Sequence, residues 1–219
     1  MIDISLIFKP LIGQMWWLLP LFILVGVLKA FKPFLKGKFG ELAVSTHVKL
    51  YLSKDDYHLL NDCTLPDGKG GTTQIDHILL SRFGIFIIET KNYKGWIFGS
   101  ERQKNWTQKI YKNSYKFQNP LHQNYKHLKV LESVLEDIVE VEFLHSIVVF
   151  MPDCEFKTEM PSNVFKGAKW TYYVESFKVP VISDIKLKRI RLRIEKEILE
   201  KSWRTNREHV EYLKSKNED

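Results

Sequence analysis

Cysteine is scarce in this sequence. Cys63 and Cys154 are the two cysteines among 219 residues, and nothing near either has metal-ligand spacing. This usage argues against a disulfide framework or a cysteine-based zinc site and is typical of reduced core residues in a cytosolic domain. Acidic residues are also outnumbered, 26 against 33 Lys and Arg, so the formal net charge is +7. The positive balance favours a polyanionic partner or an anionic membrane surface without choosing between them.

The sequence has no internal repeat and no low-complexity tract, and its glycine-rich turn at residues 66–71 lacks the spacing of a phosphate-binding loop. With 44% hydrophobic residues, the chain can bury one well-packed domain and carry an extra element, whereas two domains of ordinary size would be crowded. The expected organisation is a membrane anchor and basic linker over residues 1–36, one domain over 37–182 and a basic C-terminal helix over 183–219.

One long apolar run lies near the N-terminus. From Leu11 to Leu28 the chain carries no charge, and a helix of about 18 residues would extend roughly 27 Å, enough to cross the core of a bilayer. Lys9 alone precedes the run, whereas the lysines that follow it are Lys29, Lys32, Lys36 and Lys38. This bias predicts one transmembrane helix with the domain on the cytoplasmic side. A buried or interfacial hairpin is the alternative.

The central stretch, residues 74–95, reads as two strands that fold back on each other. In the first arm Asp76 alternates onto a face that is otherwise apolar, and in the second arm Glu89 and Lys91 do the same. If the chain reverses at residues 81–84, with a glycine free to take positive φ, then paired residues have numbers that sum to about 165. This register predicts that Asp76 lies opposite Glu89.

Two opposed carboxylates, with Cβ atoms about 5 Å apart, repel each other on a half-buried face unless a cation joins them. Hard divalent ions suit such oxygen ligands, and Lys91 adds an ammonium group on the same face. Metal and lysine can neutralise a phosphate while a metal-bound water attacks, so the group predicts phosphodiester cleavage. A buried Asp/Glu/Lys ion-pair network is the alternative.

These residues also carry a resemblance. Asp76, followed after about a dozen residues by Glu89-Thr90-Lys91, resembles the D…(D/E)xK pattern of the restriction-endonuclease-like superfamily. A wider series of blocks is similar to the nuclease-related domain (NERD) of bacterial proteins: GKFGE at 37–41, QIDHILL, GIFIIETKNYKGWI, and NPLHQN at 119–124. The resemblance covers about residues 37–135. Ile75 replaces the proline that often precedes the Asp, at a position that varies across the superfamily.

The resemblance implies a fold and a set of site residues. The fold would be α/β, with a mixed central β-sheet flanked by helices, here preceded by the transmembrane helix. The implied ligands of one or two Mg²⁺ or Mn²⁺ ions are Glu41, Asp76, Glu89 and the backbone carbonyl of Thr90. Lys91 would orient or activate the water and stabilise developing charge, and Gln123 would support that arrangement. From its place in a first helical turn, Glu41 is alternatively a capping or dipole residue.

Residues 92–115, after the central stretch, mix cations with aromatic side chains. Cations attract phosphates and aromatic rings stack on unpaired bases, so this mixture predicts a nucleic-acid surface. The expected contact residues are Lys94, Trp96, Arg102, Lys104 and Trp106. An exposed β-hairpin with a packed underside is the alternative.

Asn119-Pro120 predicts the start of a helix, with Asn as the cap and Pro in the first helical position. The expected buried stripe of this helix is Leu121, Tyr125, Leu128, Leu131, Leu135 and Ile138. His127 shares a face with Gln123 but has no nearby His or Cys partner, so it is left out of the expected metal site. Residues 143–150 and 170–174 are expected to be strands.

Together these features predict a membrane-anchored, metal-dependent nuclease that hydrolyses DNA or RNA on the cytoplasmic side of a bacterial inner membrane. Its partners would be nucleic acid and the membrane. One alternative is a membrane-tethered nucleic-acid-binding module on a non-catalytic nuclease scaffold. Another is a structural envelope protein that lays its basic C-terminal helix on anionic lipid. Metal-dependent cleavage separates the first from the other two.

Overall fold

The computed structural model describes residues 18–198. The chain divides into two units, Met1–Phe39 and Gly40–Asp219. Helix α2 (Leu18–Tyr51) passes through this boundary, so its last residues belong to the second unit. All the strands and the helices that follow α2 lie in the second unit.

The predicted membrane span is not found in the described part of the chain. No helix within residues 18–198 is both long and apolar enough to cross a membrane. The uncharged run that α2 contains from Leu18 ends at Lys29, and further lysines follow along the same helix. The first part of the predicted span, residues 11–17, lies outside the described residues.

The second unit is built on a five-stranded sheet with the strand order β1-β2-β3-β7-β9. These strands are β1 (Tyr57–Pro66), β2 (Thr72–Ser81), β3 (Gly84–Lys91), β7 (Leu144–Phe150) and β9 (Val164–Lys166). The pairs β1–β2 and β2–β3 are antiparallel, whereas β3–β7 and β7–β9 are parallel. The predicted mixed central sheet is therefore confirmed.

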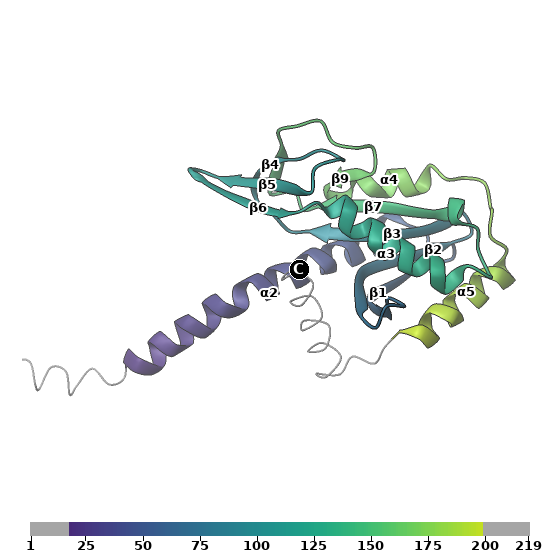
Figure 1. Ribbon diagram of the computed structural model, residues 1–219, viewed down its shortest axis with the longest axis horizontal. Helices are drawn as coiled ribbons and strands as arrows, with labels where there is room; N and C mark the ends of the chain where they lie inside the picture. Colours follow the sequence, from purple (N-terminus) through teal and green to yellow (C-terminus); the bar gives the residue numbers. More distant parts are fainter. Residues whose placement is uncertain (1–17, 199–219) are drawn as a thin grey trace, which may run out of the picture. The chain divides into compact units, whose positions relative to one another are not determined.

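A second, four-stranded sheet has the order β6-β5-β4-β8. Its strands are β4 (Gly95–Phe98), β5 (Asn105–Ile110), β6 (Asn113–Gln118) and β8 (Cys154–Phe156). Strands β4, β5 and β6 lie at one end of the second unit and helix α5 (Asp184–Glu197) lies at the other (Figure 1). The sequence predicted a β-hairpin in this region. It did not predict that β8 pairs with β4 to complete a separate sheet.

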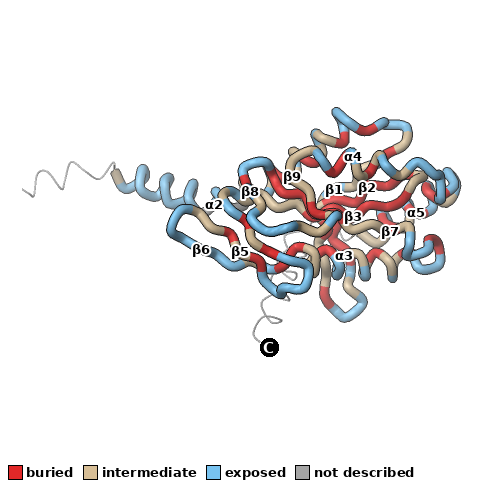
Figure 2. The backbone as a smooth tube through the Cα atoms, turned by 90° about the horizontal axis from the view of Figure 1, so that it is seen from above, coloured by how far each residue is buried: buried red, intermediate tan, exposed pale blue. Residues whose placement is uncertain are grey.

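Helices cover both faces of the central sheet. The remaining helices are α3 (Pro120–Leu135), α4 (Trp170–Glu175) and the short 3₁₀ turns η1 (Val141–Phe143) and η2 (Gly167–Lys169). On one face, apolar side chains of α3 and α5 pack against Ile78 and Ile87. On the other face, α4 and the end of α2 pack against Leu79 and Phe86. Buried backbone accordingly concentrates along β2 and β3 (Figure 2).

The β2–β3 turn has the predicted geometry. Ser81 pairs with Gly84, and the ladder continues to His77 opposite Ile88, which gives the expected sum of residue numbers. Gly84 has φ +151°, and a Cβ there would lie 2.9 Å from the His145 ring. A side chain at this turn is therefore excluded both by backbone conformation and by space.

Asn119 joins helix α3 to the loop between β4 and β5. Its Oδ1 accepts the backbone N–H of Leu121 at 2.9 Å, which caps the helix as predicted. Its Nδ2 donates to the carbonyls of Ser100, Glu101 and Gln103 at 3.3, 3.0 and 2.7 Å. One buried amide therefore fixes both the helix start and the loop.

Two helix predictions were wrong in detail. Residues 170–174, predicted to be a strand, form α4, in which Trp170, Thr171 and Val174 are buried at helical spacing. In α3 the buried face includes Asn124 and His127, while Tyr125 of the predicted stripe is 58% exposed. The Asn124 amide explains the rotated face, because its Nδ2 donates to the carbonyls of Ile87 and Ile147 and to the Ser146 hydroxyl; the distances are 2.9, 3.0 and 2.8 Å.

Gly40 lets α2 approach the end of β3 closely. A Cβ at Gly40 would lie 3.1 Å from Thr90 Cγ2 and 3.2 Å from Asn92 Cβ, tighter than ordinary side-chain contacts. A Cβ at Gly37, one turn earlier in the same helix, would meet nothing within 4 Å. The absence of a side chain at Gly40 therefore sets the distance between this helix and the sheet.

We expect Gly40→Val to lower the free energy of unfolding by about 1–3 kcal/mol, because the branched side chain forces α2 away from β3. The same substitution at Gly37 should be neutral or slightly stabilising, since valine has the higher helix propensity. Thermal unfolding of both variants checks this. Equal melting temperatures for the two would show that α2 does not depend on the close contact.

Candidate functional site

The strands β2 and β3 part at Asp76. Their ladder ends at His77 and Ile88, one pair before Asp76 and Glu89 would face each other. There the backbone N–H of Thr90 donates to Asp76 Oδ2 at 2.8 Å, so a side chain takes the role of a strand partner. The ladder has the predicted register, but it ends at the pair before Asp76 and Glu89, at the point where the strands open.

Glu89, Lys91 and Gln123 form one hydrogen-bonded group. Lys91 Nζ donates to Glu89 Oε1 at 2.7 Å and to Gln123 Oε1 at 2.9 Å. Glu89 and Lys91 come from β3 and Gln123 from α3, which packs on the same face of the sheet. The Glu89 side chain is 2% exposed and that of Lys91 is 16% exposed. The structure therefore brings these three predicted residues together.

His127 belongs to this group as well, although the sequence argument set it aside. Its Nε2 lies 3.3 Å from Glu89 Oε2, and its Nδ1 is 2.7 Å from the Thr73 hydroxyl. Neither Glu89 Oε2 nor His127 Nε2 has a hydrogen bond of good geometry in the structure, so the two face each other as a loose pair. The spacing of four residues from Gln123 was the available signal, because both side chains then share one helix face.

The two central carboxyls differ in their electrostatics. Burial first, and then the charge of Glu89, raise the pKa of Asp76 to about 8, although the Thr90 N–H and Lys91 act in the opposite sense. For Glu89 burial also acts to raise the pKa, but Lys91 and then His127 outweigh it and hold the pKa below its usual range. Glu89 is thus a compensated carboxylate and Asp76 is not.

Lys91 remains an ammonium in this setting. Burial acts to lower its pKa, but the charge and the hydrogen bond of Glu89 outweigh burial and raise the pKa above the usual value. A charged lysine donates hydrogen bonds and stabilises negative charge.

Glu41 follows Gly40 in α2, in the segment that meets the end of β3. Its charge is among the causes that raise the pKa of Asp76. Within residues 18–198, no group of three or more His, Cys, Asp and Glu side chains is arranged to hold a metal ion. The acidic side chains that act on Asp76 electrostatically thus do not form a closed cage.

Asp62 on β1 was not anticipated. The pairs Asn61 with His77 and Cys63 with Ile75 place it opposite Asp76 across the β1–β2 ladder. Its φ is +56°, a left-handed conformation that Asp tolerates better than most residues. Such conformations often occur at functional sites, but no sequence pattern announces this one.

The predicted nucleic-acid contacts lie on the second sheet and its loops. Lys94, Arg102 and Lys104 are exposed. Trp96 is 44% exposed, and the ammonium groups of Lys109 and Lys157 lie 5.9 and 4.8 Å from the centre of its ring. These cations and this ring are available to a ligand.

Trp106 was predicted to contact nucleic acid, and this prediction was wrong. Its side chain is fully buried, stacked on Phe150 with ring centres 6.0 Å apart, and its Nε1 donates to the Ser100 carbonyl. It alternates along β5 with partly exposed residues and so faces the inner side of the sheet. For Trp106 the structure therefore agrees with the alternative interpretation, a β-hairpin with a packed underside.

A known protein family matches the part of the chain that carries this site. Residues 36–151 match the nuclease-related domain family, and the match contains every residue of the group around Asp76. The chain belongs to the nuclease-related domain family. An uncharacterised protein of Bacillus anthracis is 36% identical over 202 residues, which cover 87% of this chain and 90% of that protein. No solved structure matches the chain.

The contrast between Asp76 and Glu89 predicts opposite effects on stability. With a pKa raised from 3.8 to about 8, folded Asp76 disfavours ionisation, so its contribution to stability falls as the pH rises from about 4 to about 8. Asp76→Asn keeps an acceptor for Thr90 and carries no charge. In chelator at pH 9 we expect it to melt about 3 °C above the parent, which corresponds to about 1 kcal/mol, with the difference shrinking toward pH 5.

Glu89→Gln should act in the other direction. The lowered pKa of Glu89 contributes stability that is present above its unfolded pKa of 4.5 and is lost as the pH falls through the lower folded value. Removing the charge leaves the buried ammonium of Lys91 without its ionic partner. We therefore expect the free energy of unfolding to fall by about 3 kcal/mol at neutral pH. If both variants melted below the parent at every pH, Asp76 would be one more member of a compensated ion-pair network.

Proposed function

We propose that this domain hydrolyses phosphodiester bonds in nucleic acid with a bound divalent cation. The observation that carries the proposal is the placement of the Lys91 ammonium. It is fixed between Glu89 Oε1 at 2.7 Å and Gln123 Oε1 at 2.9 Å, on the face where Asp76 lacks a compensating cation. An ion-pair network that served only stability would place a cation beside the carboxyl whose ionisation is most disfavoured, which here is Asp76.

The donor set suits a hard cation. Asp76 presents a carboxyl whose ionisation burial, Glu89 and Glu41 all oppose, and a cation would relieve that cost. Mg²⁺ often binds through one or two carboxylates together with waters and phosphate oxygens, so a closed cage of side chains is not needed. Glu41, Asp76, Glu89 and the carbonyl of Thr90 would hold Mg²⁺ or Mn²⁺, which would polarise the phosphate and lower the pKa of a bound water.

Lys91 has a clear chemical role in this proposal. An ammonium has three N–H donors, and Glu89 and Gln123 accept two of them. The remaining donor can reach a phosphate oxygen and stabilise the negative charge that grows in the transition state. Gln123 is the positioning residue, because it holds the ammonium without carrying charge.

The second sheet offers a surface for the rest of the substrate. Lys94, Arg102 and Lys104 would attract phosphates, and the exposed Trp96, flanked by Lys109 and Lys157, would stack on an unpaired base. The proposed surface differs from the predicted one because it leaves out Trp106, which is buried.

A second candidate is nucleic-acid binding without hydrolysis. The absence, over residues 18–198, of any group of three potential metal ligands favours it. Under this alternative the same cations and Trp96 bind a strand, and Lys91 serves only to neutralise Glu89.

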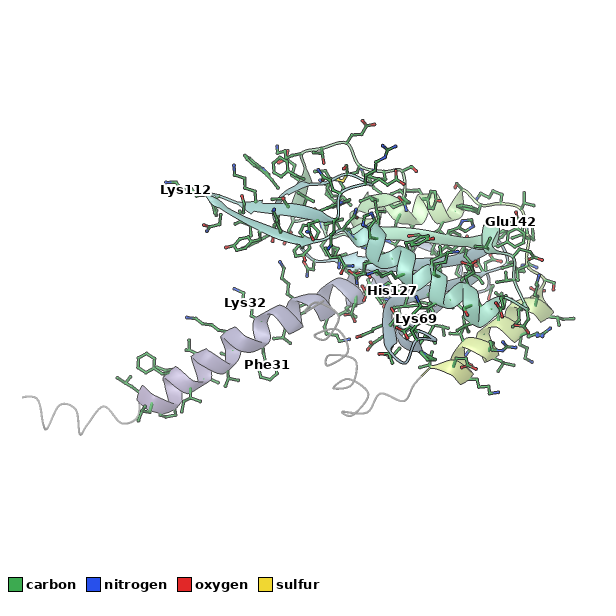
Figure 3. All side chains as sticks on the ribbon, viewed as in Figure 1. Phe31, Lys32, Lys69, Lys112, His127 and Glu142 are labelled. Atoms are coloured by element: carbon green, nitrogen blue, oxygen red, sulfur yellow. The ribbon has the colours of Figure 1, made fainter. Side chains whose placement is uncertain are left out.

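Lys91→Met separates the two. We expect cleavage of labelled DNA or RNA in Mg²⁺ to fall by about 10² or more, because charge stabilisation in the transition state is lost. Mn²⁺ affinity should persist, since the carboxylates remain. Lys112→Met, at the tip of the β5–β6 hairpin (Figure 3), is the matched control and should cleave like the parent. Melting temperatures in Mn²⁺ verify that both are folded; parent protein that binds but never cleaves would select the second candidate.

We also propose that residues 11–28 tether the chain to a bacterial inner membrane, with the domain on the cytoplasmic side. In support, apolar side chains of α2 are exposed in this stretch: Leu19 by 63%, Phe22 by 69% and Ile23 by 65%. Contiguous exposed apolar surface favours contact with lipid or protein.

Full-length chain with a reporter after Asp219 should remain in the membrane pellet after carbonate or high-salt extraction, and the reporter should behave as cytoplasmic. Phe22→Asp with Ile23→Asp should move it to the soluble fraction, since each charge opposes insertion by about 2.5–3.5 kcal/mol. Recovery of the parent itself in the soluble fraction would exclude the tether.

A further inference from the structure

A basic cleft lies beside the candidate site. It has a volume of about 760 Å³ and is lined by the glycine-rich loop between β1 and β2, by the outer side of α3 and by the end of α5. This size is in the range of pockets that hold small ligands or parts of larger ones.

The cations of the cleft fall into two pairs. Lys129 is bound to Glu132 at 2.6 Å, and Arg193 is bound to Asp137 at 3.1 Å. Lys69 and Lys126 also line the cleft, and neither forms an ion pair with any residue of the described chain. Two acids, Asp67 and Glu197, share the lining, and Asp67 Oδ1 accepts the backbone N–H groups of Lys69 and Gly71 at 2.9 and 2.8 Å. The two ammonium groups without an ion pair, one on the loop and one on α3, favour an anionic ligand with more than one charge.

Tyr125 gives the cleft an aromatic wall. It is 58% exposed, whereas the other apolar residues of α3 are buried or partly buried, and Lys129 Nζ lies 5.9 Å from the centre of its ring. An exposed ring beside ammonium groups is the arrangement that stacks an unpaired base while the cations bind the phosphates. A base inside a duplex is paired and stacked and cannot use this ring.

The cleft adjoins the group around Glu89 through Thr73 and His127. Thr73 lines the cleft, and its hydroxyl is 2.7 Å from His127 Nδ1, while His127 Nε2 lies 3.3 Å from Glu89 Oε2. Along β2, Thr73 is three residues before Asp76, or roughly 10 Å of extended chain. Thr73 and the buried His127 therefore separate a ligand in the cleft from the carboxyls that would bind the cation.

We propose that this cleft holds a single strand of nucleic acid adjoining the phosphate that is cleaved. The proposal rests on the nuclease function proposed above and adds to it the form of the substrate. Lys69 binds phosphate from the loop and Lys126 from α3, Tyr125 stacks on a base, and Thr73 and His127 form the boundary toward the cleavage site.

The test measures binding by fluorescence anisotropy of full-length protein in chelator, which prevents cleavage. The probes are labelled ten-nucleotide strands of thymidine or uridine and a labelled 20-base-pair DNA duplex. The cleft variant is Lys69→Glu with Lys126→Glu. The matched control is Lys178→Glu with Lys188→Glu, which makes the same change in net charge at exposed lysines that do not line the cleft.

The cleft variant should bind single strands about 10- to 100-fold more weakly than the control, and the slope of log affinity against log salt should become shallower by about 1.4, or 0.7 for each lost phosphate contact. Tyr125→Ala should weaken single-strand binding about 5- to 100-fold and leave duplex binding unchanged. Tyr125→Phe should restore the single-strand affinity, because the ring is retained.

Two results would overturn the cleft as the single-strand site: equal affinities for the cleft variant and its control, or a loss of duplex binding in Tyr125→Ala as large as the loss for single strands. Cleavage by the parent in Mg²⁺ is measured in parallel. A parent that cleaves while the cleft variants bind normally refutes the cleft alone, whereas a parent that neither binds nor cleaves refutes the nuclease function with it.

Discussion

The Glu89 carboxylate is almost completely buried. The surrounding side chains offset the free-energy cost of removing this charge from water. A buried charge needs a close partner, and Lys91 supplies it from the same strand at 2.7 Å. Gln123 then fixes the lysine from α3, and His127 approaches the second carboxylate oxygen. Helix α3 therefore has to present polar side chains toward the sheet at its start and apolar ones further along, which is the order in which its sequence supplies them.

The second constraint is the end of the β2–β3 ladder. Beyond His77 and Ile88 the strands no longer pair, and Asp76 occupies the opening with its carboxylate on the Thr90 N–H. Asp76 gains one hydrogen bond, from the Thr90 N–H, whereas Glu89 gains a hydrogen-bonded ammonium on Oε1 and the His127 ring near Oε2. Two acids that would be equivalent in an isolated hairpin thus become different because one strand continues to a lysine and the other does not. Pairs of carboxyls with divergent environments are a common basis for divided chemical roles.

The sequence predicted the parts of this protein that depend on local alternation. The β2–β3 register, the Gly84 turn, the Asn119 cap and the shared face of Glu89 and Lys91 all follow from residue order and turn chemistry. It did not predict what depends on distant partners. Trp106 is buried because Phe150, more than forty positions away in the chain, stacks on it; His127 matters because Thr73 and Glu89 meet there. The helix at residues 170–174 has apolar residues that suit a strand equally well, and packing on the far face of the sheet decided the outcome.

Asn119 links regions that would otherwise be independent. Its side chain caps α3 and at the same time holds three carbonyls of the loop that carries Arg102. Any displacement of that loop that preserves these hydrogen bonds must carry the first turn of α3 with it, and Gln123 belongs to that turn, since its backbone N–H donates to the Asn119 carbonyl. A movement of the loop therefore moves the Gln123 amide that holds Lys91. In this way the Asn119 side chain couples the position of the outer sheet to the position of the buried charges.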